Sequence, residues 1–145
     1  MMKHVLVGLA LLSQFSGATL NPAARRTDGV AGRYSMERAN GSGCLLDMAE
    51  FQRQRIRFQL FCDRGAPSYN MGFIEGMVPI ARGVAVFRDH GQGGVCELRI
   101  TFRHARMEVV QREEHGGCGF GYGVTADGTY RRIRTRPAFD LHPGR

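Results

Sequence analysis

The stretch CELRITFR, residues 96–103, decides the fold class, because apolar and polar side chains alternate at all eight of its positions. Successive side chains of a β-strand point to opposite faces, so the pattern predicts a strand with one buried and one solvated face. A turn at His104-Ala105 leads into a second run of this kind, residues 107–112. The two runs predict an antiparallel hairpin that brings Cys96 within a short loop of Cys118.

The segment 44–62 has two interpretations. One is a helix, since several residues fall on a helical stripe: Leu45, Met48, Ala49, Gln52 and Ile56. The other is a hairpin with an apolar face built from three opposed pairs: Cys44 with Cys62, Leu46 with Leu60, and Met48 with Phe58. We favour the hairpin because its apolar face ends in two cysteines that lie directly opposite each other.

Short segments separated by glycine-rich turns fill most of the remaining chain. They predict further strands at residues 32–38, 71–78, 83–89, 118–125 and 128–134. In residues 118–124 glycine occupies every odd position, which leaves one face of that predicted strand without side chains. The fold class expected is all-β, a small lipocalin-like antiparallel β-barrel of about eight strands whose first and last strands pair.

The chain divides into four segments: a signal peptide at 1–18, a flexible leader at 19–31, a β-barrel domain at 32–136 and a loose C-terminal tail at 137–145. The first segment combines Lys3, an apolar run at 5–12, and the small residues Ser16 and Ala18 where a signal peptidase reads the chain. This apolar run is too short to cross a bilayer, which needs roughly 20 residues. We therefore expect a periplasmic or secreted protein with no membrane span.

The predicted export bears on the state of the four cysteines, because the compartment outside the cytosol is oxidising. An even number of cysteines in an oxidising compartment predicts two disulfides, and the strand register favours Cys44–Cys62 and Cys96–Cys118 among the three connectivities. A zinc site is the competing interpretation, but the chain has no Cys-x-x-Cys pair. We expect neither a metal nor a cofactor.

The arginine-rich charge of the chain has two interpretations, an anionic partner or a codon bias of the genome. It has 20 Lys and Arg against 13 Asp and Glu, a formal net charge of +7, and Lys3 is its one lysine. Guanidinium groups suit oxyanions, but export makes nucleic acid a poor partner. At strand spacing Arg132, Arg134 and Arg136 share one face. Arg132 and Arg134 are candidate contacts to an anionic envelope polymer, the alternative being an ordinary solvated face.

Candidate binding residues lie in a predicted loop and in the glycine-rich segment: Ser68, Tyr69, Asn70 and Tyr122. A hydroxyl, a phenol and an amide in a row suit contact with a sugar or a protein cleft. The alternative is a turn in which Ser68 and Asn70 bond their own backbone. No catalytic residue is assigned, since no serine lies in a nucleophile elbow and all cysteines are expected to be bonded. We predict that the protein is not an enzyme.

The run at 96–102, followed by CGFGYGVTADGTY at 118–130, resembles small exported bacterial β-barrel proteins. In general plan the chain is similar to the periplasmic inhibitors of lysozyme, which have a signal peptide, about eight antiparallel strands and hairpins joined by disulfides. Those inhibitors plug the enzyme's cleft with a Ser-Gly-x-x-Tyr or Ser-Gly-x-Tyr loop. Ser42-Gly43 begins that motif without its tyrosine, so the resemblance assigns no inhibitory residue.

The resemblance implies a monomeric exported binding protein that is an inhibitor of, or an immunity factor for, a wall-acting hydrolase. Two alternatives remain open from the sequence: a lipocalin-like carrier of a small apolar ligand, and a structural envelope protein that binds anionic surfaces. The carrier requires an interior cavity of several hundred Å³. The inhibitor requires a filled core and a protruding polar loop near Tyr69.

Overall fold

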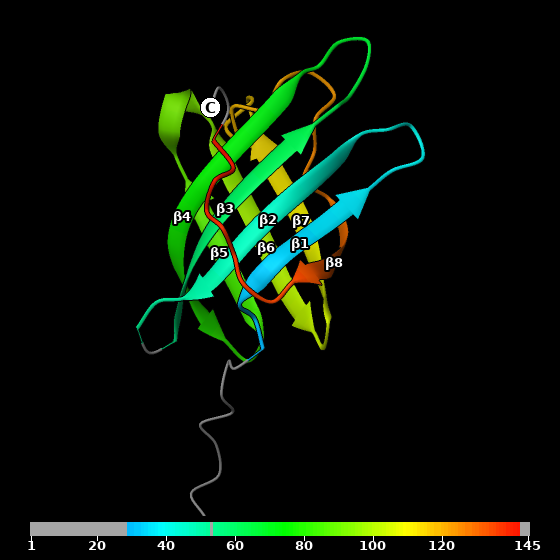
Figure 1. Cartoon of the computed structure of the whole chain (residues 1–145). Coiled ribbons are helices and arrows are strands. Elements are labelled where there is room, and N and C mark those ends of the chain that lie inside the picture. Colours follow the sequence, from blue (N-terminus) through cyan, green and yellow to red (C-terminus); the bar gives the residue numbers. More distant parts are fainter. Residues whose placement is uncertain (1–28, 53, 143–145) are drawn as a thin grey trace, which may run out of the picture.

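The computed structural model describes residues 29–52 and 54–142, which form a closed antiparallel barrel (Figure 1). Its strands are β1 (Gly32–Glu37), β2 (Gly43–Glu50), β3 (Arg55–Asp63), β4 (Met71–Ala81), β5 (Val84–Asp89), β6 (Val95–Arg103), β7 (Arg106–Glu114) and β8 (Gly128–Arg134), with a 3-10 turn η1 (Gly91–Gly93) between β5 and β6. Each strand pairs with the next, and β8 closes against β1. The predicted all-β barrel and the pairing of its first and last strands are confirmed.

Two of the predicted segments fall largely beyond the described ranges. The signal peptide, 1–18, and residues 19–28 of the leader lie outside the described residues. Within the ranges that are described, no helix is long and apolar enough to cross a membrane.

The interior of the barrel is filled by side chains that point inward at every second position. On β6, Cys96, Leu98 and Ile100 are buried, as the alternation predicts. The largest fully buried side chains come from several strands and include Tyr34, Tyr130, Phe58, Leu46, Met48 and Ile56. Burying one such side chain stabilises the fold by about 1.5–3 kcal/mol, so this interior is the main stabilising element.

Two buried tyrosines sit on the strands that close the barrel. Tyr34 of β1 donates its hydroxyl hydrogen bond to the Val30 carbonyl at 2.9 Å, and Tyr130 of β8 donates to the Ala126 carbonyl at 2.8 Å. A buried hydroxyl without a partner would cost about 1–3 kcal/mol, so each bond permits the tyrosine to lie inside. Burial raises the pKa of both phenols. Each bond also ties the strand to the segment of chain that leads into it.

Both predicted disulfides form, and they lie at one end of the barrel. The register of β2 and β3 opposes Cys44 to Cys62 and Leu46 to Leu60, so the hairpin is confirmed and the helix is wrong. The second disulfide joins Cys96, at the start of β6, to Cys118 in the β7–β8 connection. Alternate connections of an antiparallel barrel share an end. We call the end with loops 38–42, 64–70, 90–94 and 115–127 the disulfide end.

The strand predicted at residues 118–125 is wrong, because this segment is an irregular loop. Gly119 and Gly123 have φ values of +66° and +75°, in the left-handed region that an extended strand does not use. The loop turns twice, and the second turn is closed by the Val124 N–H on the Gly121 carbonyl at 3.0 Å. The glycines of this segment therefore form turns, although their spacing matches the two-residue period of a strand.

The predicted loose tail is also wrong for the described part of it. Residues 138–142, which we call the strap, cross the outside of β1, β2 and β3, as the red segment in Figure 1 shows. Leu141 in the strap is buried. The strap is held by side chains of the barrel wall and has contacts on four strands, since the His142 ring also lies 5.2 Å from the Phe73 ring of β4.

We predict that Gly72→Ala destabilises the protein. Phe120 from the β7–β8 loop lies on the bare backbone of Gly72, and a Cβ there would stand 2.1 Å from its ring. Overpacking of this kind costs about 1–3 kcal/mol, which denaturant unfolding would measure. The matched control is Gly29→Ala, where nothing lies within 4 Å of the added Cβ. Equal stability of the two variants would contradict the packing of Phe120 on Gly72.

Candidate functional site

Two exposed tyrosines mark the disulfide end of the barrel. Tyr69, in the β3–β4 loop, is 66% exposed, and Tyr122, in the β7–β8 loop, is 85% exposed. Large aromatic side chains are rarely left this open, and they dominate binding energy where proteins meet. We call Arg64, Tyr69, Asn70, Met71 and Tyr122 the tyrosine surface.

The two loops of the tyrosine surface are joined by hydrogen bonds. Asn70 donates its side-chain N–H to the Tyr122 carbonyl at 2.9 Å, and Gly121 donates its backbone N–H to the Met71 carbonyl at 3.0 Å. The Arg64 guanidinium donates to the Tyr122 carbonyl at 3.3 Å and lies 5.6 Å from the centre of its ring. These contacts fix the backbones of the two loops that carry the tyrosines, and the Arg64 guanidinium also lies over the Tyr122 ring.

The sequence-predicted residues of this region are thus brought together by the fold. Asn70 and Tyr122, separated by more than fifty positions, share a hydrogen bond, and Tyr69 and Ser68 are exposed in the same loop as Asn70. Asn70 bonds across to the other loop, and its own carbonyl also accepts the Arg64 N–H at 2.9 Å. Sequence reasoning missed Arg64, and no local pattern distinguishes it from the other arginines.

The base of the β7–β8 loop is anchored to the barrel wall. The Arg38 guanidinium donates to the carbonyls of Thr125 and Asp127 at 3.3 and 2.5 Å. The Asp127 carboxylate accepts the Gln111 backbone N–H at 2.6 Å. With the Cys96–Cys118 disulfide at the other side, the loop is fixed at both of its ends. Loops on a rigid scaffold are suited to binding.

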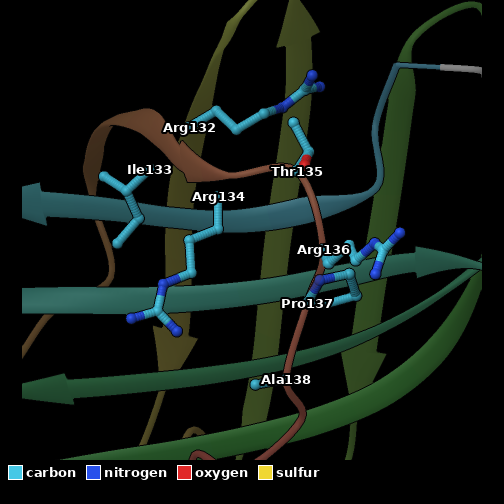
Figure 2. Close-up of a pocket in the computed structure, with 7 residues that line it drawn as sticks. All are labelled: Arg132, Ile133, Arg134, Thr135, Arg136, Pro137 and Ala138. Carbon is cyan, nitrogen blue, oxygen red and sulfur yellow. The ribbon is translucent and has the colours of Figure 1, made fainter.

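Arg132 and Arg134 lie at the opposite end of β8 from the tyrosine surface. The Arg132 guanidinium donates to the Tyr34 hydroxyl at 3.0 and 2.8 Å, so this side chain is occupied within the protein. Arg134 is exposed. Figure 2 shows the two guanidinium groups pointing in different directions beside a surface hollow of about 680 Å³ lined by residues 132–138. They do not form the expected common face.

A row of polar side chains crosses the outside of four neighbouring strands. The strand register aligns Arg33 on β1 with Asp47 on β2, Asp47 with Gln59 on β3, and Gln59 with Glu75 on β4. Asp47 and Gln59 are fully buried although their side chains face away from the interior. We call these four residues the polar row, and the strap is what covers it.

The strap bonds to the polar row at every second residue. Phe139 donates its backbone N–H to the Asp47 carboxylate at 2.8 Å, and Leu141 donates to the Gln59 side-chain oxygen at 3.3 Å. Arg33 pairs with Asp47 through two bonds of 2.9 and 2.6 Å and also with Asp140. The only hint of this segment in the sequence is the alternation of apolar Phe139 and Leu141 with polar Asp140 and His142.

The described part of the chain offers no cluster of side chains that could bind a metal ion. Within residues 29–52 and 54–142, no group of three or more His, Cys, Asp or Glu side chains could hold a metal ion. Comparisons with protein-family models, curated proteins and solved structures find no match for this chain. What the surfaces can bind therefore has to follow from their own geometry.

We predict that Asp47→Ala lowers the free energy of unfolding by about 3–5 kcal/mol, because it leaves the buried Arg33 guanidinium without its main partner. Denaturant unfolding of the variant would measure the loss. Glu97→Gln is a matched control, since it breaks an ion pair with Arg88 whose arginine side chain is 65% exposed. An equal loss in both variants would show that the Arg33–Asp47 pair has no special role.

We predict that acid releases the strap. The Arg33 guanidinium holds the pKa of the Asp140 carboxyl below its ordinary value of 3.8. A lowered pKa stabilises the folded state above the ordinary value, and this stabilisation is lost as the pH falls through the lowered value. The Leu141 amide resonance should move toward its unfolded position on acidification, and Asp140→Asn should show part of that shift at neutral pH. Identical spectra for both proteins at neutral pH would contradict the coupling.

Proposed function

We propose that this chain is an exported, non-catalytic binding protein of the cell envelope that inhibits a peptidoglycan-acting enzyme or confers immunity against it. The observation that supports this most directly is the tyrosine surface. It presents two open aromatic rings on loops that are joined to each other and anchored by a disulfide. A surface ordered in advance loses little conformational entropy on binding, as an inhibitor that enters a cleft requires.

The packing of the barrel supports a binding surface over an interior carrier. Tyr34, Tyr130 and Phe58 are fully buried and occupy the space that a carried ligand would need. The surface hollow of about 680 Å³ is lined by residues 132–138 of the last strand and the segment after it. A lipocalin-like carrier would instead place its cavity inside the wall.

The charge and the compartment of this protein limit the class of partner protein that it can bind. Without residues 1–18 the exported protein has 19 arginines against 13 acidic residues, a net charge of +6. This charge speeds encounter with an acidic protein and slows encounter with a basic one. The two disulfides are compatible with an oxidising compartment outside the cytosol. The proposed partner is therefore an acidic or neutral wall hydrolase in the periplasm or outside the cell, bound by a monomer of this protein.

We predict that Tyr69→Ala combined with Tyr122→Ala abolishes this binding. Exposed aromatic anchors each contribute about 2 kcal/mol or more at an interface, a factor of roughly 30 per residue. The wild-type protein is used to capture hydrolases from an envelope extract. Each recovered hydrolase is then assayed for clearing of peptidoglycan with and without the protein.

The control is Ile133→Ala, which removes an exposed apolar side chain from the last strand, away from the disulfide end. Inhibition by wild type and by this control, and none by the double tyrosine variant, is the expected result. Recovery of lipid in place of a hydrolase would contradict the proposal and favour a carrier. Full inhibition by the double variant would exclude the tyrosine surface as the contact.

A further inference from the structure

The wall of the barrel is incompletely paired between β4 and β5. β4 pairs with β3 along most of its length, but it pairs with β5 only at Ile80 and Ala81. The two strands therefore separate toward the disulfide end. We call the gap between residues 72–79 of β4 and 86–89 of β5 the seam. An unpaired strand edge is a surface on which another chain can add a strand.

At alternate residues of β4 the backbone N–H and C=O groups point into the seam. Ile80 donates its N–H to Gln54 on the β3 side at 2.8 Å, while the Met71 carbonyl accepts from Gly121 on the other side at 3.0 Å. Because neighbouring residues of a strand alternate, odd-numbered residues from 73 to 77 point their N–H and C=O groups toward β5. Among the described residues none of these groups pairs with β5, and only the Met77 carbonyl has another protein donor, the Arg55 guanidinium at 3.4 Å.

A hollow of about 270 Å³ lies along the seam. Its lining comes from β4 and β5, with the aromatic residues Phe73 and Phe87 and the acidic residues Glu75 and Asp89. Ile74, Cys96, Gly117 and Cys118 complete it. The Phe87 ring is held edge-on to Phe58, with ring centres 5.4 Å apart. The hollow therefore combines fixed aromatic rings with two negative charges.

The negative charges of the hollow are not neutralised by an ion pair within residues 29–52 and 54–142. Glu75 accepts from the Gln59 side chain at 3.0 Å, and Asp89 accepts from the Gly91 N–H at 3.0 Å, so both have neutral donors. The nearby Arg88 is paired with Glu97 at 2.6 Å. Aromatic rings beside carboxylates are the environment that a guanidinium or ammonium group on an apolar stem prefers.

We propose that the seam binds an extended segment of a partner protein, which pairs with the edge of β4 and inserts an arginine or lysine side chain into the hollow. The free backbone groups require an extended chain, and the carboxylates select a cation. The seam adjoins the tyrosine surface at Met71 but shares none of its residues, and the proposal goes beyond the proposed function. It holds or fails independently of a wall hydrolase.

The probes are three acetylated and amidated heptapeptides of alternating valine and threonine that differ in the central residue: arginine, norleucine or glutamate. Each peptide is titrated into the protein that begins at residue 19, and the backbone N–H resonances of β4 are followed by NMR. The arginine peptide should shift the N–H signals of Phe73, Glu75 and Met77 and slow their hydrogen exchange. It should bind roughly tenfold or more tightly than the norleucine peptide, because it adds charge-assisted contacts.

Two variants separate the backbone contribution from the charge contribution. Met77→Pro removes an N–H that faces the seam and leaves pairing with β3 intact, since proline is tolerated on a strand edge and already occurs at Pro79. It should weaken all peptides. Glu75→Gln with Asp89→Asn should remove the preference for arginine alone. The matched control, Glu108→Gln, changes an exposed carboxylate on β7 and should leave binding unchanged.

Equal binding of the arginine and norleucine peptides by wild type would overturn the cation site. Shifts outside β4 and β5, or unchanged binding by a folded Met77→Pro variant, would overturn strand addition. The wild-type titration tests the proposal even where a variant fails to fold. Tyr69→Ala with Tyr122→Ala should bind the arginine peptide like wild type, which keeps this result distinct from the hydrolase assay.

Discussion

Every part of this structure depends on the burial of alternate side chains inside a closed wall. A strand that buries its even-numbered residues commits them to the interior along its whole length, because a shift of one residue would turn each of them outward. The even-numbered residues are buried on two strands well separated in the sequence: Leu98 and Ile100 on β6, and Tyr130 on β8. Tyr34, Tyr130 and Phe58 fill interior space, and the candidate binding places described above lie on loops and at a strand edge.

The disulfide end shows how loops acquire order on such a barrel. The β7–β8 connection is long, yet Cys118 ties it to β6 and Arg38 holds the carbonyls near its other end. Phe120 enters the barrel and packs on Gly72, where no other residue would leave room for the ring. The loop can then present Tyr122 to solvent in a fixed position, since the residues around it are already anchored.

The outside of the wall is divided between a covered region and an open one. Over β1 to β3 the strap satisfies the buried Asp47 and Gln59, which would otherwise be costly polar groups under a covering chain. Toward the disulfide end β4 and β5 are not paired, and acidic residues and phenylalanines line the hollow there. The strap shows that a segment of chain can bind to the outer face of the barrel through its backbone N–H groups. At the seam it is the backbone of β4 itself that is left unpaired.

The sequence by itself predicted the barrel class, and it favoured the β2–β3 register and both disulfides over a helix and two other connectivities, because period-two burial and opposed cysteines are local patterns. It also identified Tyr69, Asn70 and Tyr122 as candidates, although nothing in it related the two loops. Only the tertiary structure decided that residues 118–125 turn instead of extending, since glycine permits both conformations and the disulfide and Phe120 select one. The strap and the seam also came from tertiary structure alone. The polar row looks like an ordinary solvated face until residues 138–142 cover it, and a missing strand pairing leaves no mark on either strand's own pattern.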